Sequence, residues 1–224
     1  SPYVGDGMFE YNIVLSRFLN WPDTLARVGY QHFHVPVGLE NVLESITQEG
    51  KKVWGNAYVI TTHGMKMPKA HYLAHDVLGA VYSNLEWLRN ACRGHHSGPT
   101  CASASKALQC IGGIGSFLAA QVVADLKNTK DHPLYEATDR STFVEPGPGS
   151  IRGLSWFHYG EPNKIGVSAF QRYFKEVRAY VDSHWPADVP VVDNQDLQNC
   201  LCEFDKYCRV TTGTGRSKRG YAGV

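Results

Sequence analysis

The chain has no large excess of charge of either sign and no long apolar run. Its 224 residues include 22 Lys and Arg against 21 Asp and Glu, and the net charge is +1. This balance excludes a uniformly basic protein that coats DNA. No apolar run of about 18 residues is present and no signal peptide opens the chain, so we expect no membrane contact. The six cysteines form no regular framework, which favours an intracellular location (the host cytoplasm if the protein is viral).

Recognisable nucleotide and metal motifs are also lacking. Gly213 and Gly215 lie in a GTGRSK stretch whose spacing is not that of a phosphate-binding P-loop, so the chain is not itself a P-loop kinase. Cysteines and histidines between residues 92 and 101 lack the paired spacing of a zinc site. We therefore expect no cofactor and no metal.

The apolar residues recur mostly at helical spacing, which predicts a mainly α fold. We expect a single helical domain over residues 1–224 with a basic tail at about 210–224. Residues 53–62 have a strand-like composition, and residues 127–164 read as loop-rich. The predicted helices are 9–28 (broken at Trp21-Pro22), 39–49, 77–92, 103–126, 168–184 and 193–208.

The stretch LQCIGGIGSFLA, residues 108–119, is typical of a helical hairpin that binds DNA. Gly113 and Gly115 permit a tight turn and close backbone approach to a ligand, and Ser116 is expected to cap the second helix. The amides of that helix can then bind phosphate without reading sequence. A glycine-rich connection between two core helices would give the same pattern.

With this hairpin and Asp139 in the stretch YEATDRSTF, the sequence resembles the helix-hairpin-helix DNA glycosylase superfamily. The resemblance implies that Asp139 faces a flipped nucleotide. The sequence departs from this superfamily in two ways: it lacks the lysine of the bifunctional members, and it lacks the iron–sulfur cysteines of some members. From the residues alone, Asp139 in this turn-like region also suits a capping aspartate.

A closer resemblance covers most of the chain. The sequence is similar to phage proteins of thymine hypermodification, namely α-glutamyl/putrescinyl thymine pyrophosphorylases with their amino acid:DNA transferases, and the helical domain of 5-hydroxymethyl-deoxyuridine (5-hmdU) DNA kinases. Members usually carry a further N-terminal segment, whereas this chain begins at Ser1. The matching stretches are NIVLSRFLNWPDTL (12–25), VWGNAYVIT (53–61), GGIGSFLAAQVVADL (112–126), PGPGSIRGL (146–154) and LCEFDKYCRV (201–210).

Charged residues in the second half of the chain are candidates for phosphate or pyrophosphate contacts. Arg152 follows PGPG, which reads as a rigid turn with exposed amides, and its guanidinium can hold pyrophosphate or pair with a core carboxylate. Glu203 and Lys206 are predicted to share one helix face, as catalytic residues lining a cleft or as a surface ion pair. The remaining cations are Arg209, expected to bind pyrophosphate, and Arg216, Lys218 and Arg219, expected to bind DNA or to form a solvated tail.

Aromatic and amide side chains near the N-terminus predict a pocket for a flipped base, in which Asn20, Trp21 and Asn56 bind the substrate. Most tryptophans are simply core residues, and these also suit that interpretation.

Three functions are compatible with these features. The resemblance implies a transferase that acts on double-stranded DNA carrying a modified base, and that replaces the pyrophosphate of a 5-(pyrophosphoryloxymethyl)uracil with an amine or amino acid. In it Asp139 would deprotonate the amine while Arg152 and Lys206 hold the pyrophosphate. A monofunctional base glycosylase is the second hypothesis. A non-catalytic module that presents modified DNA to a 5-hmdU DNA kinase is the third.

Overall fold

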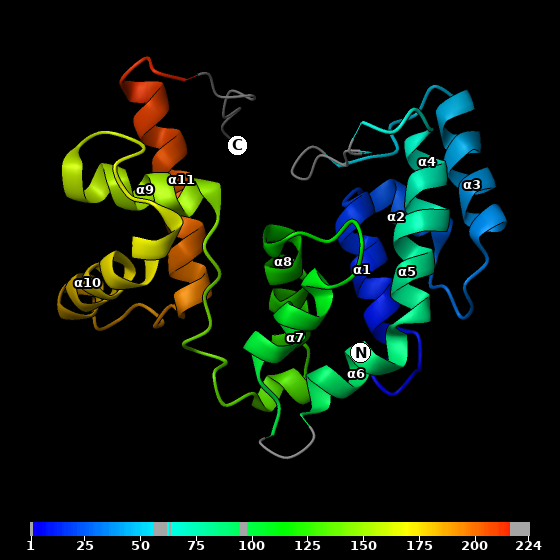
Figure 1. Ribbon diagram of the computed structural model, residues 1–224, viewed down its shortest axis with the longest axis horizontal. Helices are drawn as coiled ribbons and strands as arrows, with labels where there is room; N and C mark the ends of the chain where they lie inside the picture. The colour runs from blue at the N-terminus through cyan, green and yellow to red at the C-terminus, as the bar shows by residue number, and fades with distance from the viewer. Residues whose placement is uncertain (1, 56–61, 63, 95–97, 216–224) are drawn as a thin grey trace. The chain divides into compact units, whose positions relative to one another are not determined.

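The computed structural model describes residues 2–55, 62, 64–94 and 98–215, and these form helices joined by turns and loops (Figure 1). No strand occurs among the described residues, including the described part of the strand-like segment, residues 53–55 and 62. The predicted mainly α fold is therefore confirmed. The chain divides into two compact units, residues 1–140 and 141–224, and the single domain over residues 1–224 stays a prediction.

The helices of unit 1 follow the apolar periodicity of the sequence, with two interruptions. One is the predicted break at Trp21-Pro22, where Asn20 adopts a left-handed φ of 41° and ends α1. The other divides the predicted helix 77–92 at Asn84. The elements are α1 (Phe9–Leu19), α2 (Pro22–Val28), α3 (Pro36–Gln48), α4 (Lys69–His71), the π-helix η1 (Tyr72–Val77), α5 (Leu78–Ser83), α6 (Leu85–Arg93), α7 (Cys101–Gln109), α8 (Ser116–Lys127) and the 3₁₀ helix η2 (Pro133–Glu136).

The core of unit 1 surrounds α1, which packs against α5, α6 and α8. Tyr11 and Leu15 of α1 are fully buried, as are Leu78 of α5 and Leu88 of α6. Burying each such side chain stabilises the fold by about 1.5–3 kcal/mol. Arg17 of α1 also forms a two-pronged ion pair with Asp125 of α8, which fixes the register of these two helices.

Unit 2 consists of α9 (Pro148–Tyr159), the 3₁₀ helix η3 (Val167–Ala169), α10 (Phe170–His184) and α11 (Asn194–Thr211). The loop-rich prediction for residues 127–164 is therefore wrong over α9 and η2. Helix α9 begins inside the segment read as a rigid turn: Pro148 takes the first helical position, where a missing amide costs nothing. The Gly147 amide donates to Ser150 Oγ (3.1 Å) and completes the helix start.

Glycines allow α9 and α11 to cross at close range. A Cβ on Gly153 would lie 2.1 Å from the carbonyl oxygen of Leu201, so only glycine fits at this crossing. Asp193 caps α11 by accepting the amides of Gln195 (2.8 Å) and Asp196 (2.9 Å). The core of unit 2 consists of Leu154, Ile165, Phe170, Phe174, Val177, Leu197 and Leu201.

The described helices include none that is both long enough and apolar enough to cross a membrane.

Candidate functional site

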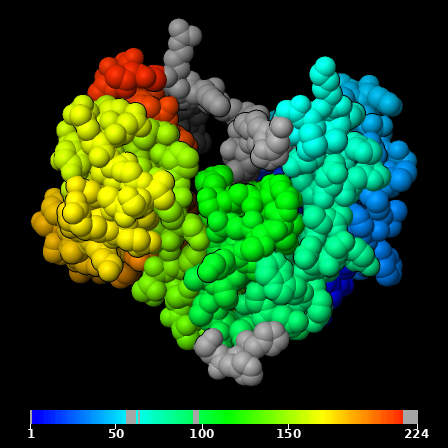
Figure 2. Space-filling model, in the orientation of Figure 1, coloured from blue at the N-terminus to red at the C-terminus, as the bar shows by residue number. Residues whose placement is uncertain are grey.

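The predicted hairpin is present in unit 1: α7 and α8 are joined by residues 110–115, and its surface is drawn in green in Figure 2. Ile111 and Ile114 are buried and anchor the turn. Gly113 has a φ of 88°, and a Cβ there would lie 2.7 Å from Val77 Cγ2 and 3.0 Å from the Tyr72 hydroxyl. Gly113 therefore packs directly on η1, so its role is to seat the turn on the π-helix.

The exposed part of the hairpin that has no close neighbour is the start of α8. Gly115 is exposed, and nothing lies within 4 Å of a Cβ placed on it. The expectation that Ser116 caps the helix is wrong: Ser116 is the first helical residue, Gly115 is the N-cap, and no side chain caps the helix. A glycine N-cap leaves room for an external anion to approach the first-turn amides of α8.

Asp139 is held against the other end of α7. Its Oδ1 accepts the Cys101 amide (2.6 Å) and its Oδ2 accepts the Ala102 amide (2.9 Å). A carboxylate is favoured there by the helix dipole and by the unpaired amides of the first turn. Helix α7 has nine residues, so at 1.5 Å per residue Asp139 lies about 13 Å along the axis from the hairpin turn. Its geometry is that of the capping aspartate considered from the sequence.

In unit 2, two of the predicted pyrophosphate ligands meet at one carboxylate. Asp205 of α11 is 1% exposed. Its Oδ2 accepts Arg152 Nε (3.0 Å) and Nη2 (2.9 Å) and lies 3.2 Å from Arg209 Nε, while its Oδ1 accepts Trp156 Nε1 (3.2 Å). Two guanidinium groups share one carboxylate, so this cluster carries a surplus positive charge. Arg152 thus takes the role that the sequence offered as its alternative, a partner for a core carboxylate.

Glu203 and Lys206 form an ion pair on the exposed face of α11, with side chains 70% and 60% exposed. Such a pair contributes little to stability, because water solvates both charges. Asp205 is on another face of the helix, where it is buried. The structure thus shows the surface ion pair that the sequence offered as the alternative, and the catalytic assignment of Glu203 and Lys206 stays a prediction.

The predicted base pocket is partly described. Asn20 and Trp21 lie at the junction of α1 and α2, and Lys52 Nζ sits 3.5 Å from the centre of the Trp21 ring. This cation covers one of the two faces of the Trp21 ring. The other predicted residues Asn56, Arg216, Lys218 and Arg219 lie outside the described residues.

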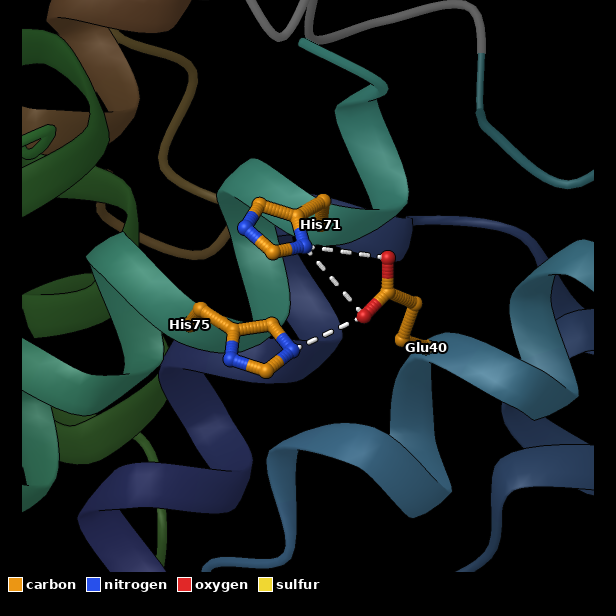
Figure 3. A group of neighbouring side chains, drawn as sticks. All are labelled: Glu40, His71 and His75. Carbon is orange, nitrogen blue, oxygen red and sulfur yellow. Dashed lines mark hydrogen bonds and ion pairs between the residues drawn. The ribbon is translucent and has the colours of Figure 1, made fainter.

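A group of side chains that the sequence interpretation missed is built by α3, α4 and η1 (Figure 3). Glu40 Oε1 lies 3.1 Å from His71 Nδ1, and Glu40 Oε2 lies 2.8 Å from His75 Nε2. Burial would raise the pKa of Glu40, but hydrogen bonds with His75 and His71 outweigh it and hold this pKa below its usual range. The signal in the sequence was HYLAH, two histidines four residues apart.

A pocket of about 480 Å³ lies elsewhere in unit 1. None of the residues predicted from the sequence lines it, so it does not join the hairpin or Asp139 into a larger site. Its lining residues are Arg93, Pro99, Lys130, Asp131, His132, Pro133, Tyr135 and Glu136.

Comparison with known proteins gives one family. The family described as 5-hmdU DNA kinase, helical domain, matches residues 10–217, which cover most of both units. Neither the curated proteins nor the solved structures contain a match.

Proposed function

The chain belongs to the family of 5-hmdU DNA kinase helical domains, which connects it with the hypermodification of thymine in DNA, and from this premise we propose that it binds duplex DNA carrying a modified thymine. The contact would be the α7–α8 hairpin, through the backbone amides at the start of α8. This single observation carries the proposal: an exposed glycine N-cap, with nothing within 4 Å of a Cβ placed on it, on a turn anchored by buried isoleucines.

The chain's net charge of +1 fits a local contact better than a broad electrostatic one. Backbone amides at a helix start bind a phosphate oxygen without discriminating between sequences. Affinity should therefore fall with salt and differ little between DNA sequences. A preference for the modified base would have to come from other residues, Asn20 and Trp21 among them.

The two glycines of the hairpin allow binding to be separated from folding. Gly115→Val meets no neighbouring atom, so the fold should persist while the side chain blocks the approach of a phosphate. We expect duplex affinity to fall about 10- to 150-fold, as for loss of a hydrogen bond to a charged group (about 1.5–3 kcal/mol). Gly113→Val is unsuitable because its side chain would collide with Val77.

Fluorescence anisotropy on matched duplexes containing thymine or 5-hydroxymethyluracil measures this effect. Gly166→Val, at an equally open glycine in unit 2, is the control and should bind like the wild type. Unchanged affinity of the Gly115 variant, with an unchanged circular dichroism spectrum, would remove the hairpin from the DNA contact.

The finer proposal is that the chain is the transferase of this pathway. The amine nitrogen would form a bond to the 5-methylene carbon of a 5-(pyrophosphoryloxymethyl)uracil, the C–O bond would break, and pyrophosphate would leave with the electron pair. The amine gives up a proton, and Asp139 is the proposed base. This role requires Asp139 to release at least one of the two α7 amides that it accepts.

Arg152 and Arg209 of unit 2 support the finer proposal on electrostatic grounds. They are about one-third exposed and share one carboxylate, so an anion with two phosphates could satisfy the surplus charge. Lys206, which is 60% exposed and forms an ion pair with surface Glu203, is a weaker candidate.

Product analysis separates the three functions. Modified duplex DNA is incubated with the protein and candidate amines, digested to nucleosides and analysed by mass spectrometry. A transferase adds the mass of the amine, releases pyrophosphate and leaves the strand intact. Free base with alkali-labile strands identifies a glycosylase. Unchanged nucleosides together with DNA binding would leave the module that presents DNA to a partner kinase. Asp139→Asn should lower transferase turnover by about 100-fold if Asp139 is the base.

A further inference from the structure

We propose that Glu40, His71 and His75 bind a divalent transition-metal ion, and that zinc is the ion best matched to them. The inference goes beyond DNA binding and amine transfer, since neither requires a metal. One carboxylate and two imidazoles, from the consecutive elements α3, α4 and η1, meet here (Figure 3). One ligand atom from each side chain lies within 4.8 Å of the other two.

The distances between these ligand atoms are close to those of a metal site. Zinc bonds of about 2.0–2.2 Å to nitrogen and oxygen place neighbouring ligand atoms about 3–3.5 Å apart. Glu40 Oε2, the oxygen near both rings, lies 3.3 Å from His71 Nδ1 and 2.8 Å from His75 Nε2. Only small side-chain movements would be needed to admit an ion, which would replace the hydrogen-bonded protons.

The spacing of the two histidines explains why their imidazoles lie on the same side, because residues four apart share one face of a helix. His71 ends α4 and His75 lies within η1, and their rings stack with centroids 4.3 Å apart and planes at 18°. Turns of the π-helical kind, such as η1, are rare and occur often at functional sites. Here the turn is held in place by Gly113, which packs on Val77 and Tyr72.

The ligand set identifies the kind of ion. Imidazole nitrogens with a carboxylate suit zinc, iron(II) and related ions, whereas magnesium and calcium prefer oxygen ligands. Three protein ligands leave at least one position open, as in catalytic zinc sites. The His71 side chain is 44% exposed, so an ion, a water molecule or an anionic oxygen can reach the site from solvent.

Cobalt(II) reports directly on such a site in the full chain. The protein is stripped with a chelator and titrated with Co²⁺, followed by visible absorption and competition with Zn²⁺. We expect one Co²⁺ per chain, with ligand-field bands, without a thiolate charge-transfer band, and displaced by Zn²⁺. The missing thiolate band distinguishes this site from any formed by the six cysteines.

Variants assign the ligands. His75→Gln and Glu40→Gln should each weaken binding by about tenfold or more, because even outer partners of metal ligands are worth that much. Glu44→Gln, on the same helix α3, is the matched control and should bind like the wild type. If a ligand variant unfolds, the wild-type chain is treated with diethyl pyrocarbonate with and without zinc, and the modified histidines are mapped. Bound zinc should protect His71 and His75 from modification. The proposed site would be refuted by the absence of Co²⁺ binding or by a thiolate charge-transfer band. It would also be refuted if the ligand variants bound Co²⁺ as tightly as the wild type.

Discussion

Removing the Asp205 carboxylate should destabilise unit 2 far more than removing any exposed acid of α11. Asp205 is nearly completely buried and accepts hydrogen bonds from Arg152 and Trp156, with Arg209 as a third partner. Asp205→Ala breaks all of these contacts at once. It leaves two cations facing each other and a buried indole N–H with no acceptor.

The magnitude follows from how far water can replace the lost contacts. Breaking a fully buried ion pair costs about 3–5 kcal/mol. Arg152 and Arg209 keep about one-third of their side-chain surface exposed, so hydration reduces that penalty. Trp156 is buried, and its unsatisfied N–H costs about 1–3 kcal/mol. We expect Asp205→Ala to lose about 2–4 kcal/mol of unfolding free energy, and Asp205→Asn, which keeps one acceptor, about half of that.

Urea unfolding measured by circular dichroism and tryptophan fluorescence provides the assay. With a denaturant slope of about 1–3 kcal/mol per M, the midpoint of Asp205→Ala should fall by about 1–2 M. Glu203→Gln, two residues away on the same helix, removes only a surface pair and should shift stability by less than about 0.5 kcal/mol. If the two variants were equally stable, Asp205 would not organise the arginines as argued.

Three further outcomes follow from particular residues. A hydrogen bond from Arg27 is the main cause that lowers the pKa of Glu49 to about 2. The stabilising effect of the Glu49 carboxylate is therefore complete above the ordinary glutamate pKa and is lost as the pH falls toward 2. The difference in unfolding free energy between wild type and Glu49→Gln should shrink over that pH interval. Exposed Cys110 should be alkylated in the native chain, and duplex DNA should protect it from alkylation. Burial raises the pKa of the Cys92 thiol, so Cys92 should react only after unfolding. Peptide mapping measures both reactions. Gly153→Ala should cost about 1–3 kcal/mol in urea unfolding, because its methyl group collides with the α11 backbone.

Local patterns in the sequence predicted most helices, because those helices bury one periodic apolar face. The α7–α8 hairpin was predictable for a similar local reason, because its glycines stand between two apolar helical runs. The start of α9 was not, since proline and glycine in PGPG are typical of turns until Pro148 is known to occupy the first helical position. The glycines of α9 allow its close contact with α11. A contact between segments so far apart in the sequence produces no local pattern from which it could be predicted.

Candidate site residues were less predictable than helices, because a side chain's role depends on its partner. The sequence around Arg152 is equally compatible with an arginine that binds an external anion and with one that pairs with Asp205. Only the crossing of α9 with α11, which brings Asp205 to Arg152, selects the second role. Asp139 likewise finds its partners at Cys101 and Ala102, far away in sequence. The histidines of HYLAH carried a recognisable spacing, but their carboxylate comes from α3, thirty or so residues earlier.

The π-helix η1 relates the proposed DNA contact to the proposed metal site. Tyr72 and Val77 of η1 support Gly113 of the hairpin, while His75 of the same turn meets Glu40. A metal bound to the native state alone stabilises that state, by about 2.7 kcal/mol at a free concentration one hundred times the dissociation constant. Because the ion would hold η1 against α3, it would stiffen the surface on which the hairpin rests. Zinc should then strengthen duplex binding by the wild type while leaving His75→Gln unchanged, and DNA should strengthen zinc binding by the same factor. Zinc without effect on DNA affinity would show that the two sites act independently, even though they share one helical turn.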